Sequence, residues 1–418
     1  METTYTEKMS ARHILVIISG IMMTFSCTAM VFSTWSAFQA VVPEMLGVEK
    51  ATWAAYVTVL YVTSAVASPF VGKIMPKVDM RVLLSASVAL MGGGFLVIWA
   101  IRQLWAFYLA GFMMGLGAVS VLWLAIPTMF GNWFNQRSGT FIGLCMAFTG
   151  IGGALCMQHF NALYAGGEGV DVWTIYLIWG VIALAGSLPF TLLFVRRTPQ
   201  EVGELPYGKP QTKSGKPAGL SASKAMHLPV FYSVFMLAGI INLLTMVAQQ
   251  FPTYTKSLTD VPFDVLSVGI MMATVMMVAQ AISKFALGVA VDKSVKGSFF
   301  AATVAGVVGV LLVWFGFESP AMLYSGAAVY GFFFASCMVL IPQVVRHVFG
   351  SREYAEIYSR IGLFLNITGA LGPVFWAFLG RFGFPLLFSV AVVLLVVVIA
   401  LGVFTFARAK AVQDQWTE

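Results

Sequence analysis

The chain has 418 residues, of which 59% are hydrophobic and only 10% are charged. A soluble protein has about 25% charged residues, so the composition excludes a water-soluble globular domain and indicates a polytopic membrane protein surrounded by lipid. Lys and Arg in cytoplasmic loops explain the net charge of +7, and we expect no nucleic-acid partner.

Apolar runs of about 20 residues, the length that crosses a bilayer, occur twelve times along the chain. The first run is too long for the apolar core of a signal peptide, so we interpret it as an uncleaved first span. The predicted spans are 13–40, 51–75, 80–101, 105–130, 138–160, 171–195, 228–254, 264–291, 298–317, 320–345, 354–379 and 384–407.

A long polar segment rich in Pro, Gly and Lys interrupts this pattern in the middle of the chain. It predicts an N-terminal six-helix bundle at 1–195, a cytoplasmic linker at 196–227 and a C-terminal six-helix bundle at 228–418. With both termini placed in the cytoplasm, most of the 24 Lys and Arg residues fall on the inner side. We therefore predict an integral protein of a bacterial inner (plasma) membrane with cytoplasmic termini.

Three landmarks recur between the two halves at a nearly constant offset of about 215 positions. A repeat of this kind predicts two pseudo-equivalent bundles, a substrate site near the midplane at their interface, and alternating access by rocking. The landmarks are a basic loop motif beginning at Gly72 and Gly288, an Ile-Pro pair at 126–127 and 341–342, and an arginine at Arg137 and Arg352.

The spans, the central linker and the basic loops resemble the major facilitator superfamily. The loop "GVAVDKSVKG" at 288–297 matches the family pattern through Gly288, Asp292 and two lysines, whereas Pro76 replaces the acidic residue in the first copy. The resemblance implies an all-α fold of two six-helix bundles. It also implies a gating role for Asp292, paired with Arg346 or Arg352, and for Arg137.

Within that superfamily, "NWFNQRSGTFIGLCMAFTGIGG" at 132–153 resembles the fifth-span signature of monocarboxylate transporters and oxalate/formate antiporters. The segment "FSTWSAFQAVVPEMLGV" at 32–48 is similar to the first-span region of the oxalate/formate group. Gln136 and Ser138 depart from the basic residues of the fifth-span pattern. The resemblance implies a transporter of small organic anions.

Lys284 lies inside the eighth predicted span, where ionisable side chains are costly and usually functional. It shares a predicted helical face with Met277, Gln280 and Gly288. The families named above carry a cation at the matching place, so the resemblance implies that Lys284 binds a substrate carboxylate. The alternative is snorkelling toward Asp292, eight residues or about 12 Å along the helix.

Arg360 is the second cation within a span, and Glu356 lies four residues earlier, in the order that favours a helical ion pair. Arg360 is therefore predicted either to contact substrate or to serve as a structural or gating residue. Polar and aromatic side chains near the presumed centre complete the candidate substrate site. They are Trp35, Tyr61, Asn242, Gln280, Phe364 and Asn366.

The 17 Asp and Glu residues all lie in predicted loops, termini or span ends. Buried acids are the usual proton relays of transporters. Cations without a buried acid therefore favour an anionic substrate, carried by exchange or facilitated diffusion, with proton symport left open. A multidrug or lipophilic-compound exporter and a non-transporting receptor are the alternatives. No nucleotide or zinc motif is present, so we expect no enzyme activity and no cofactor, and we expect a monomer.

Overall fold

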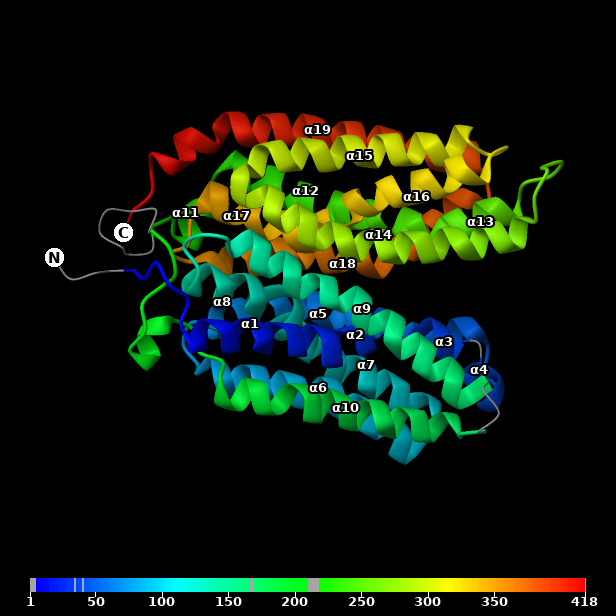
Figure 1. The fold of residues 1–418 in the computed structure, drawn as a ribbon, viewed down its shortest axis with the longest axis horizontal. Coiled ribbons are helices and arrows are strands. Elements are labelled where there is room, and N and C mark those ends of the chain that lie inside the picture. The colour runs from blue at the N-terminus through cyan, green and yellow to red at the C-terminus, as the bar shows by residue number, and fades with distance from the viewer. Residues whose placement is uncertain (1–4, 34, 40, 166–168, 210–217, 418) are drawn as a thin grey trace. The chain divides into compact units, whose positions relative to one another are not determined.

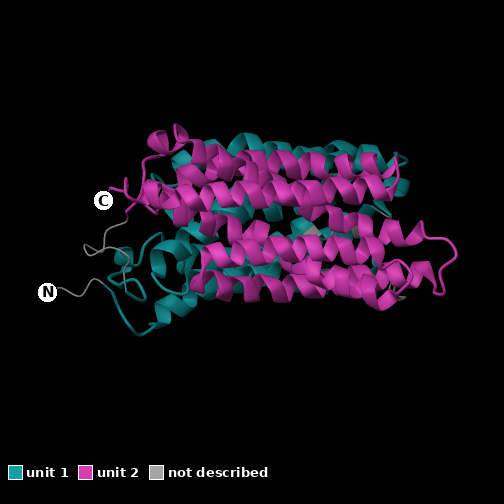
Figure 2. Cartoon of the chain, turned by 90° about the horizontal axis from the view of Figure 1, so that it is seen from above, with its two compact units in different colours: residues 1–216 teal, residues 217–418 magenta. Residues whose placement is uncertain are grey.

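The computed structural model describes residues 5–33, 35–39, 41–165, 169–209 and 218–417, and these residues form helices and connecting loops without a β-strand (Figure 1). Twelve helices are long and apolar enough to cross a membrane. The number of spans predicted from hydropathy is therefore confirmed. The chain divides into two compact units, Met1–Lys216 and Pro217–Glu418 (Figure 2).

The N-terminal unit contains six of the candidate spans. Its first span is α1 (Ala11–Met23), a π-helical segment (Thr24–Thr28) and α2 (Ala29–Ser33), followed by the short helices α3 (Trp35–Gln39) and α4 (Val42–Met45). The remaining spans are α5 (Lys50–Ile74), α6 (Met80–Ile101), α7 (Leu104–Ala118) continued through Val119–Ala125 into α8 (Ile126–Trp133), α9 (Ser138–Ala165) and α10 (Val172–Leu193).

The first span is predicted at 13–40. Its apolar helical stretch is Ala11–Phe32, and the described residues 35–39 form α3. Residues 34 and 40 lie outside the described residues, so the C-terminal limit of this span stays a prediction.

The C-terminal unit contains the other six spans. They are α12 (Pro229–Thr245) continued through Met246–Gln250 into α13 (Phe251–Lys256), α14 (Val265–Lys293), α15 (Val295–Phe315), α16 (Pro320–Phe334) continued through Ser336–Leu340 into α17 (Ile341–Phe349), α18 (Tyr354–Gly380) and α19 (Phe384–Gln413). The short helix α11 (Ala222–Met226) precedes them.

Spans four and ten share an irregularity at the repeated Ile-Pro pair. Pro127 follows the π-helical segment Val119–Ala125, and Pro342 follows the π-helical segment Ser336–Leu340. A proline has no N–H to donate to the carbonyl four residues earlier, and its ring crowds that carbonyl. Because those carbonyls lie inside the π-helical segments, the helix widens there and continues. The sequence repeat thus reproduces the same local geometry in both units.

Glycines allow close helix contact in the N-terminal unit, where α7 packs against α5. A Cβ added at Gly111 would lie 2.5 Å from the Tyr56 carbonyl oxygen, and one at Gly115 would lie 2.5 Å from that of Leu60. Both oxygens belong to α5. Only a residue without a side chain therefore permits this approach of α7 to α5.

The first part of the predicted linker packs on the N-terminal unit. The indole N–H of Trp133 donates to the Arg196 carbonyl at 2.9 Å, and the amide of Asn135 donates to the Gly208 carbonyl at 3.0 Å. A ring nitrogen of His13 contacts the Leu205 carbonyl at 3.1 Å. Residues 196–208 are therefore held by this unit, and 210–217 lie outside the described residues.

Candidate substrate site

Lys284 lies in α14 on the side that faces protein. Its exposed fraction is 2%, whereas the nearby apolar residues Ile282 and Phe285 are 65% and 43% exposed. Exposed apolar side chains on a spanning helix are those that lipid covers. The buried line of α14 contains Met276, Ser283, Lys284, Leu287 and Gly288. Met277, predicted on the face of Lys284, is exposed and lies outside this line.

The ammonium group of Lys284 lies beside span ten. It is 5.9 Å from the centroid of the Phe334 ring, at the end of α16, a distance at which a cation is attracted by an aromatic ring. It also interacts electrostatically with Cys337, in the π-helical segment that follows. These neighbours come from another helix, which supports the inward interpretation of Lys284 over snorkelling toward Asp292.

Asn242 connects three helical segments near the same π-helical segment. Its amide nitrogen donates to the Leu365 carbonyl at 2.6 Å, and the Cys337 thiol donates to its amide oxygen at 3.2 Å. The Thr368 hydroxyl lies 3.4 Å from the amide nitrogen. Asn242 is 4% exposed, so its polar groups must be satisfied within the protein. Its amide therefore positions α18 and the π-helical segment relative to α12.

Asn366 carries a buried acceptor in α18. The residue is fully buried, and its amide nitrogen donates to the Gly362 carbonyl at 2.8 Å. Its amide oxygen is buried and accepts no hydrogen bond from the described residues. An unsatisfied buried polar atom costs about 1–3 kcal/mol. This oxygen is thus a buried acceptor whose hydrogen-bonding capacity is unused among the described residues.

Phe364 and Gln280 serve mainly as packing residues in this structure. The Phe364 ring stacks on Phe235 with a centroid distance of 4.9 Å and an interplanar angle of 10°. It also covers Gly239, where an added Cβ would lie 2.0 Å from the ring. Gln280 is half-buried where Gly331 of α16 lets the two backbones approach. Phe364 therefore packs against α12, the helix of Asn242, and Gln280 packs against α16 one turn before Lys284.

Arg360 forms the helical ion pair that the sequence indicates. Its guanidinium contacts the Glu356 carboxylate at 2.7 Å, and each side chain is 26% exposed. A second guanidinium nitrogen lies 2.7 Å from the Met226 sulfur in α11. Nε of Arg360 is buried without a hydrogen-bond partner among the described residues. These contacts favour the structural interpretation of Arg360 over direct substrate contact.

The two predicted substrate residues of the N-terminal unit are half-buried. The Tyr61 ring in α5 meets Phe32 edge-on at a centroid distance of 5.8 Å. Trp35 lies at the start of α3. Their roles in substrate binding remain predictions, because each has packing surroundings of its own.

The predicted gating residues lie at helix ends. Asp292 is exposed near the end of α14, and Arg346 is half-buried in α17. The exposed Arg352 donates to the Thr417 hydroxyl. Arg137 is exposed and has a φ of 60°, a left-handed conformation that is uncommon for residues other than glycine. The pairing of Asp292 with Arg346 or Arg352 stays a prediction.

Sequence reasoning missed the surroundings of Cys337. All four cysteines are buried and free. Nothing in the local sequence distinguishes Cys337 from the other three, because its partners Asn242 and Lys284 belong to other helices. Cys337 lies in the π-helical segment Ser336–Leu340, and the only sequence feature that indicates this segment is Pro342, which follows it.

Solved transporter structures resemble this fold along nearly the whole chain. The E. coli fucose:proton symporter FucP matches with a TM-score of 0.67 and 12% sequence identity, covering 95% of this chain and 99% of that chain. The proton:xylose symporter XylE matches with a TM-score of 0.71 and 11% identity, covering 95% of this chain and 94% of that chain. At such identities the likeness shows the fold alone.

No curated protein sequence matches the chain. The sequence profile of the Major Facilitator Superfamily, however, matches residues 20–273 and 258–415. The two matched stretches together extend over most of the chain and include α14 with Lys284. The chain therefore belongs to the Major Facilitator Superfamily, and it is a membrane transporter and not an enzyme.

Proposed function

We propose that the chain transports small organic anions, monocarboxylates or short dicarboxylates, by alternating access, and that Lys284 binds the substrate carboxylate. The observation that carries this proposal is the burial of the Lys284 side chain, 2% exposed, in a membrane-spanning helix. Charged side chains within spans are expensive to maintain and are retained mainly for transport or signalling.

The distribution of acids supports an anionic substrate. The Asp and Glu residues that the structure describes lie in loops or near the ends of helices; Glu356, for example, is in the first turn of α18. A carboxylate that binds beside a buried ammonium group gains a charge-assisted hydrogen bond. It also offsets the desolvation of the lysine. The substrate is thus the natural source of negative charge in the middle of the membrane.

The neighbouring amides supply orientation. Asn242 is fixed by Leu365 and Cys337, whereas the Asn366 oxygen has an unused acceptor position. A hydroxyl group on a short hydroxy acid would satisfy that acceptor. Exchange of one anion for another needs no titratable relay, and proton symport is the alternative coupling. We further propose a monomer in a bacterial inner membrane with cytoplasmic termini, in keeping with the Lys and Arg distribution.

Counterflow in proteoliposomes tests the proposal. Vesicles loaded with unlabelled carboxylate should accumulate the labelled compound through the wild-type protein. Lys284→Gln should lose at least tenfold of that uptake, because a neutral amide lacks the charge-assisted bond worth about 1.5–3 kcal/mol. Lys256→Gln, which removes an exposed lysine at the end of α13 in the same unit, is the matched control. Full carboxylate uptake by Lys284→Gln would overturn the proposal.

A neutral polyhydroxylated substrate is the second candidate. The unused acceptor of Asn366 suits a hydroxyl donor as well as it suits an acid, and FucP and XylE are symporters for fucose and xylose. A sugar would leave the charge of Lys284 without its proposed role, so the carboxylate remains the first choice. Counterflow of a neutral sugar that Lys284→Gln leaves unchanged would favour this second candidate.

A further inference from the structure

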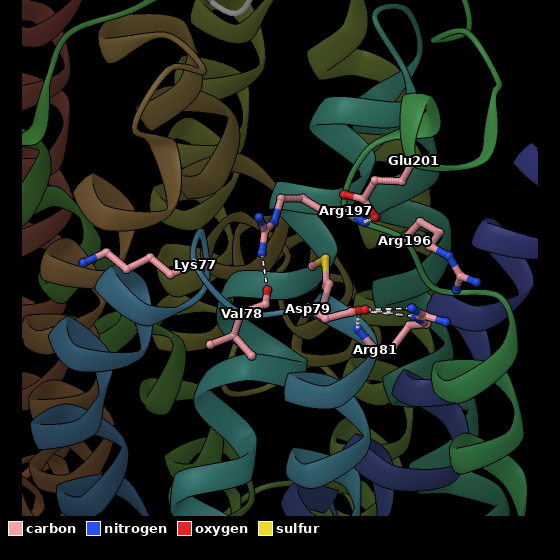
Figure 3. A pocket seen from close by; sticks show the side chains of 8 residues that line it. Lys77, Val78, Asp79, Arg81, Arg196, Arg197 and Glu201 are labelled. Carbon is pink, nitrogen blue, oxygen red and sulfur yellow. Dashed lines mark hydrogen bonds and ion pairs between the residues drawn. The ribbon is translucent and has the colours of Figure 1, made fainter.

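A cationic cavity of about 340 Å³ lies within the N-terminal unit, where α5 ends, α6 begins and α10 ends (Figure 3). Four of its lining residues are cations and two are carboxylates, so the lining has an excess of positive charge. No predicted substrate residue contributes to it. The lining residues are Lys77, Val78, Asp79, Met80, Arg81, Arg196, Arg197 and Glu201.

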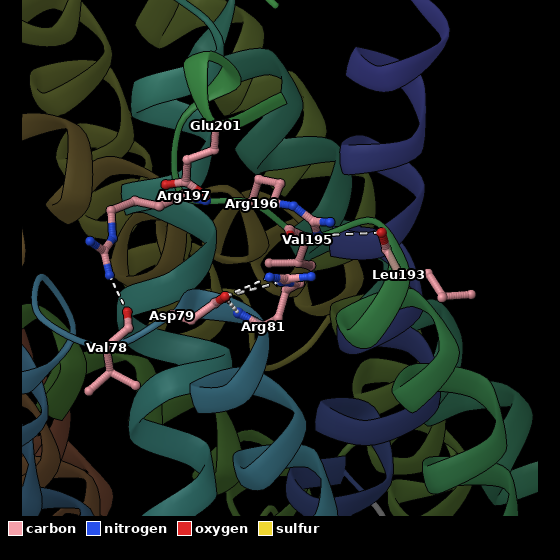
Figure 4. Close-up of polar contacts among 8 residues, drawn as sticks. All are labelled: Val78, Asp79, Arg81, Leu193, Val195, Arg196, Arg197 and Glu201. Carbon is pink, nitrogen blue, oxygen red and sulfur yellow. Dashed lines mark hydrogen bonds and ion pairs between the residues drawn. The ribbon is translucent and has the colours of Figure 1, made fainter. Parts of the chain in front are cut away.

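Arg197 fixes the loop that forms one wall. Its guanidinium donates to the Pro76 carbonyl at 2.6 Å and to the Met75 carbonyl. It also donates to the Val78 carbonyl (Figures 3 and 4). These oxygens follow the C-terminal end of α5, where carbonyl groups lack helical partners. The loop conformation is therefore set by a cation from the segment after α10.

Both carboxylates of the cavity already have partners. Asp79 is the N-cap residue of α6, and its carboxylate accepts a hydrogen bond from the backbone N–H of Arg81. The carboxylate also accepts from the Arg81 guanidinium, with a closest contact of 2.7 Å (Figure 4). Glu201 accepts from the backbone N–H of Arg197 at 3.3 Å and from the Thr198 hydroxyl at 3.4 Å. The site is thus poorly suited to an ammonium group and suited to an anion.

Arg196 forms no ion pair with the described residues. Its guanidinium donates to the Val195 carbonyl at 2.7 Å and has a longer contact of 3.4 Å to that of Leu193 (Figure 4). Burial lowers the pKa of Arg196 and repulsion from Arg81 and Arg12 lowers it further, whereas attraction to Asp79 and Glu201 acts in the opposite direction. The group nevertheless stays charged at any physiological pH. A bound anion would relieve this repulsion and satisfy the remaining N–H groups.

The cavity borders the apolar surface of the spans. Leu192 and Leu193, at the end of α10, are 52% and 58% exposed, and Val82, in the first turn of α6, is 61% exposed. These side chains lie where lipid acyl chains would cover them, while the cations beside them lie at the level of lipid headgroups.

We propose that this cavity binds the phosphate group of an anionic phospholipid, with the acyl chains against the apolar residues of α6 and α10. Arginine suits the task because its planar guanidinium donates two parallel hydrogen bonds to phosphate oxygens. The proposal is independent of the transported substrate.

Native mass spectrometry of the purified full-length protein tests the proposal. Delipidated protein is titrated with phosphatidylglycerol and with phosphatidylcholine of the same acyl chains. Arg196→Gln should weaken phosphatidylglycerol binding about fivefold, the effect of roughly one surface cation on an anionic lipid. Lys50→Gln, which removes an exposed lysine from the opposite end of α5, should have no effect. Arg196→Lys should retain most of the preference, which separates lost charge from misfolding.

Two results would overturn the proposal. One is equal binding of the two lipids by the wild-type protein. The other is an unchanged preference for phosphatidylglycerol in a folded Arg196→Gln variant. Competition with inorganic phosphate and with glycerol phosphate distinguishes a lipid headgroup from a soluble phosphate compound as the natural ligand. If either displaces phosphatidylglycerol at equimolar concentration, the cavity is a site for soluble phosphate compounds and the lipid assignment is wrong.

Discussion

The Cys337 thiol donates a hydrogen bond to the Asn242 amide at 3.2 Å, and the same amide donates to the Leu365 carbonyl at 2.6 Å. One buried side chain thereby joins spans seven, ten and eleven. The contact fixes the π-helical segment Ser336–Leu340 next to Lys284. This neutral hydrogen-bond network thus lies beside the buried cation.

Asn242→Leu should therefore destabilise the protein. Its removal leaves the Cys337 thiol and the Leu365 carbonyl to find new partners in an apolar environment, at a cost of about 1–2 kcal/mol. The thermal unfolding midpoint in detergent should fall. Gln249→Leu, at an exposed position four residues beyond α12, is the control. Equal midpoints for the two variants would show that the network adds nothing to stability.

Lys284→Met should separate function from stability. An apolar side chain of similar length avoids the desolvation cost of a buried cation, so the unfolding midpoint should stay the same or rise. Carboxylate uptake should nevertheless be lost. Lys256→Met, at an exposed site at the end of α13, should keep both properties. A large loss of stability without loss of uptake would assign Lys284 a purely structural role.

Much of the fold was predictable because hydropathy directly reports lipid contact. Twelve apolar runs correspond to twelve candidate spans, and Gly111 and Gly115 allow the close helix contact that their spacing indicates. Hydropathy did not predict the π-helical segments Val119–Ala125 and Ser336–Leu340. Such segments depend on local hydrogen bonding, which average hydropathy does not measure.

The site was less predictable than the fold. Lys284 is conspicuous in sequence because a cation interrupts an apolar run. The contacts of Asn242 with Cys337, 95 positions apart, arise only from tertiary packing. The carbonyl cluster bound by Arg197 is equally invisible, because every residue has a backbone oxygen and only the folded loop brings three of them together.

A charge exchange between Glu356 and Arg360 should preserve transport. The two side chains form an ion pair at 2.7 Å in a half-exposed setting, which is worth about 0.3–1 kcal/mol. Glu356→Gln should lower stability by that amount, and the double variant Glu356→Arg/Arg360→Glu should recover part of it. The KM for the carboxylate should change less than about twofold in the double variant. A tenfold increase would instead place Arg360 in contact with substrate.

The Asp79–Arg81 pair predicts a pH dependence confined to acidic conditions. The hydrogen bond from Arg81 lowers the pKa of the Asp79 carboxyl below its ordinary value. A carboxyl group whose pKa is lower in the folded state stabilises the protein at pH values above its unfolded-state pKa of about 3.9. That stabilisation is lost as the pH falls through the folded-state pKa. The side chains are about 40% exposed, so solvent screening limits the effect to less than about 1 kcal/mol.

Unfolding midpoints between about pH 3 and pH 6 test this assignment. Asp79→Asn should flatten the acidic part of the curve, and high salt should reduce the difference between wild type and variant. Asp171→Asn is the matched control, because Asp171 begins α10 without a side-chain capping bond. A wild-type curve that Asp79→Asn leaves unchanged would contradict the stabilising role of the pair.

Gly115→Ala should separate α7 from α5 and destabilise the N-terminal unit. The added Cβ would lie 2.5 Å from the Leu60 carbonyl oxygen and 2.9 Å from the Thr63 side chain. A backbone oxygen cannot rotate away, so the helices must move apart at a cost of about 1–3 kcal/mol. Gly93→Ala in α6 is the control, because its nearest neighbour is the flexible end of Met113 at 3.4 Å. Alanine there should be neutral or slightly stabilising through its higher helix propensity. Unfolding midpoints should therefore fall for Gly115→Ala alone, and a shared decrease would mean that glycine is needed at both positions for reasons other than this helix contact.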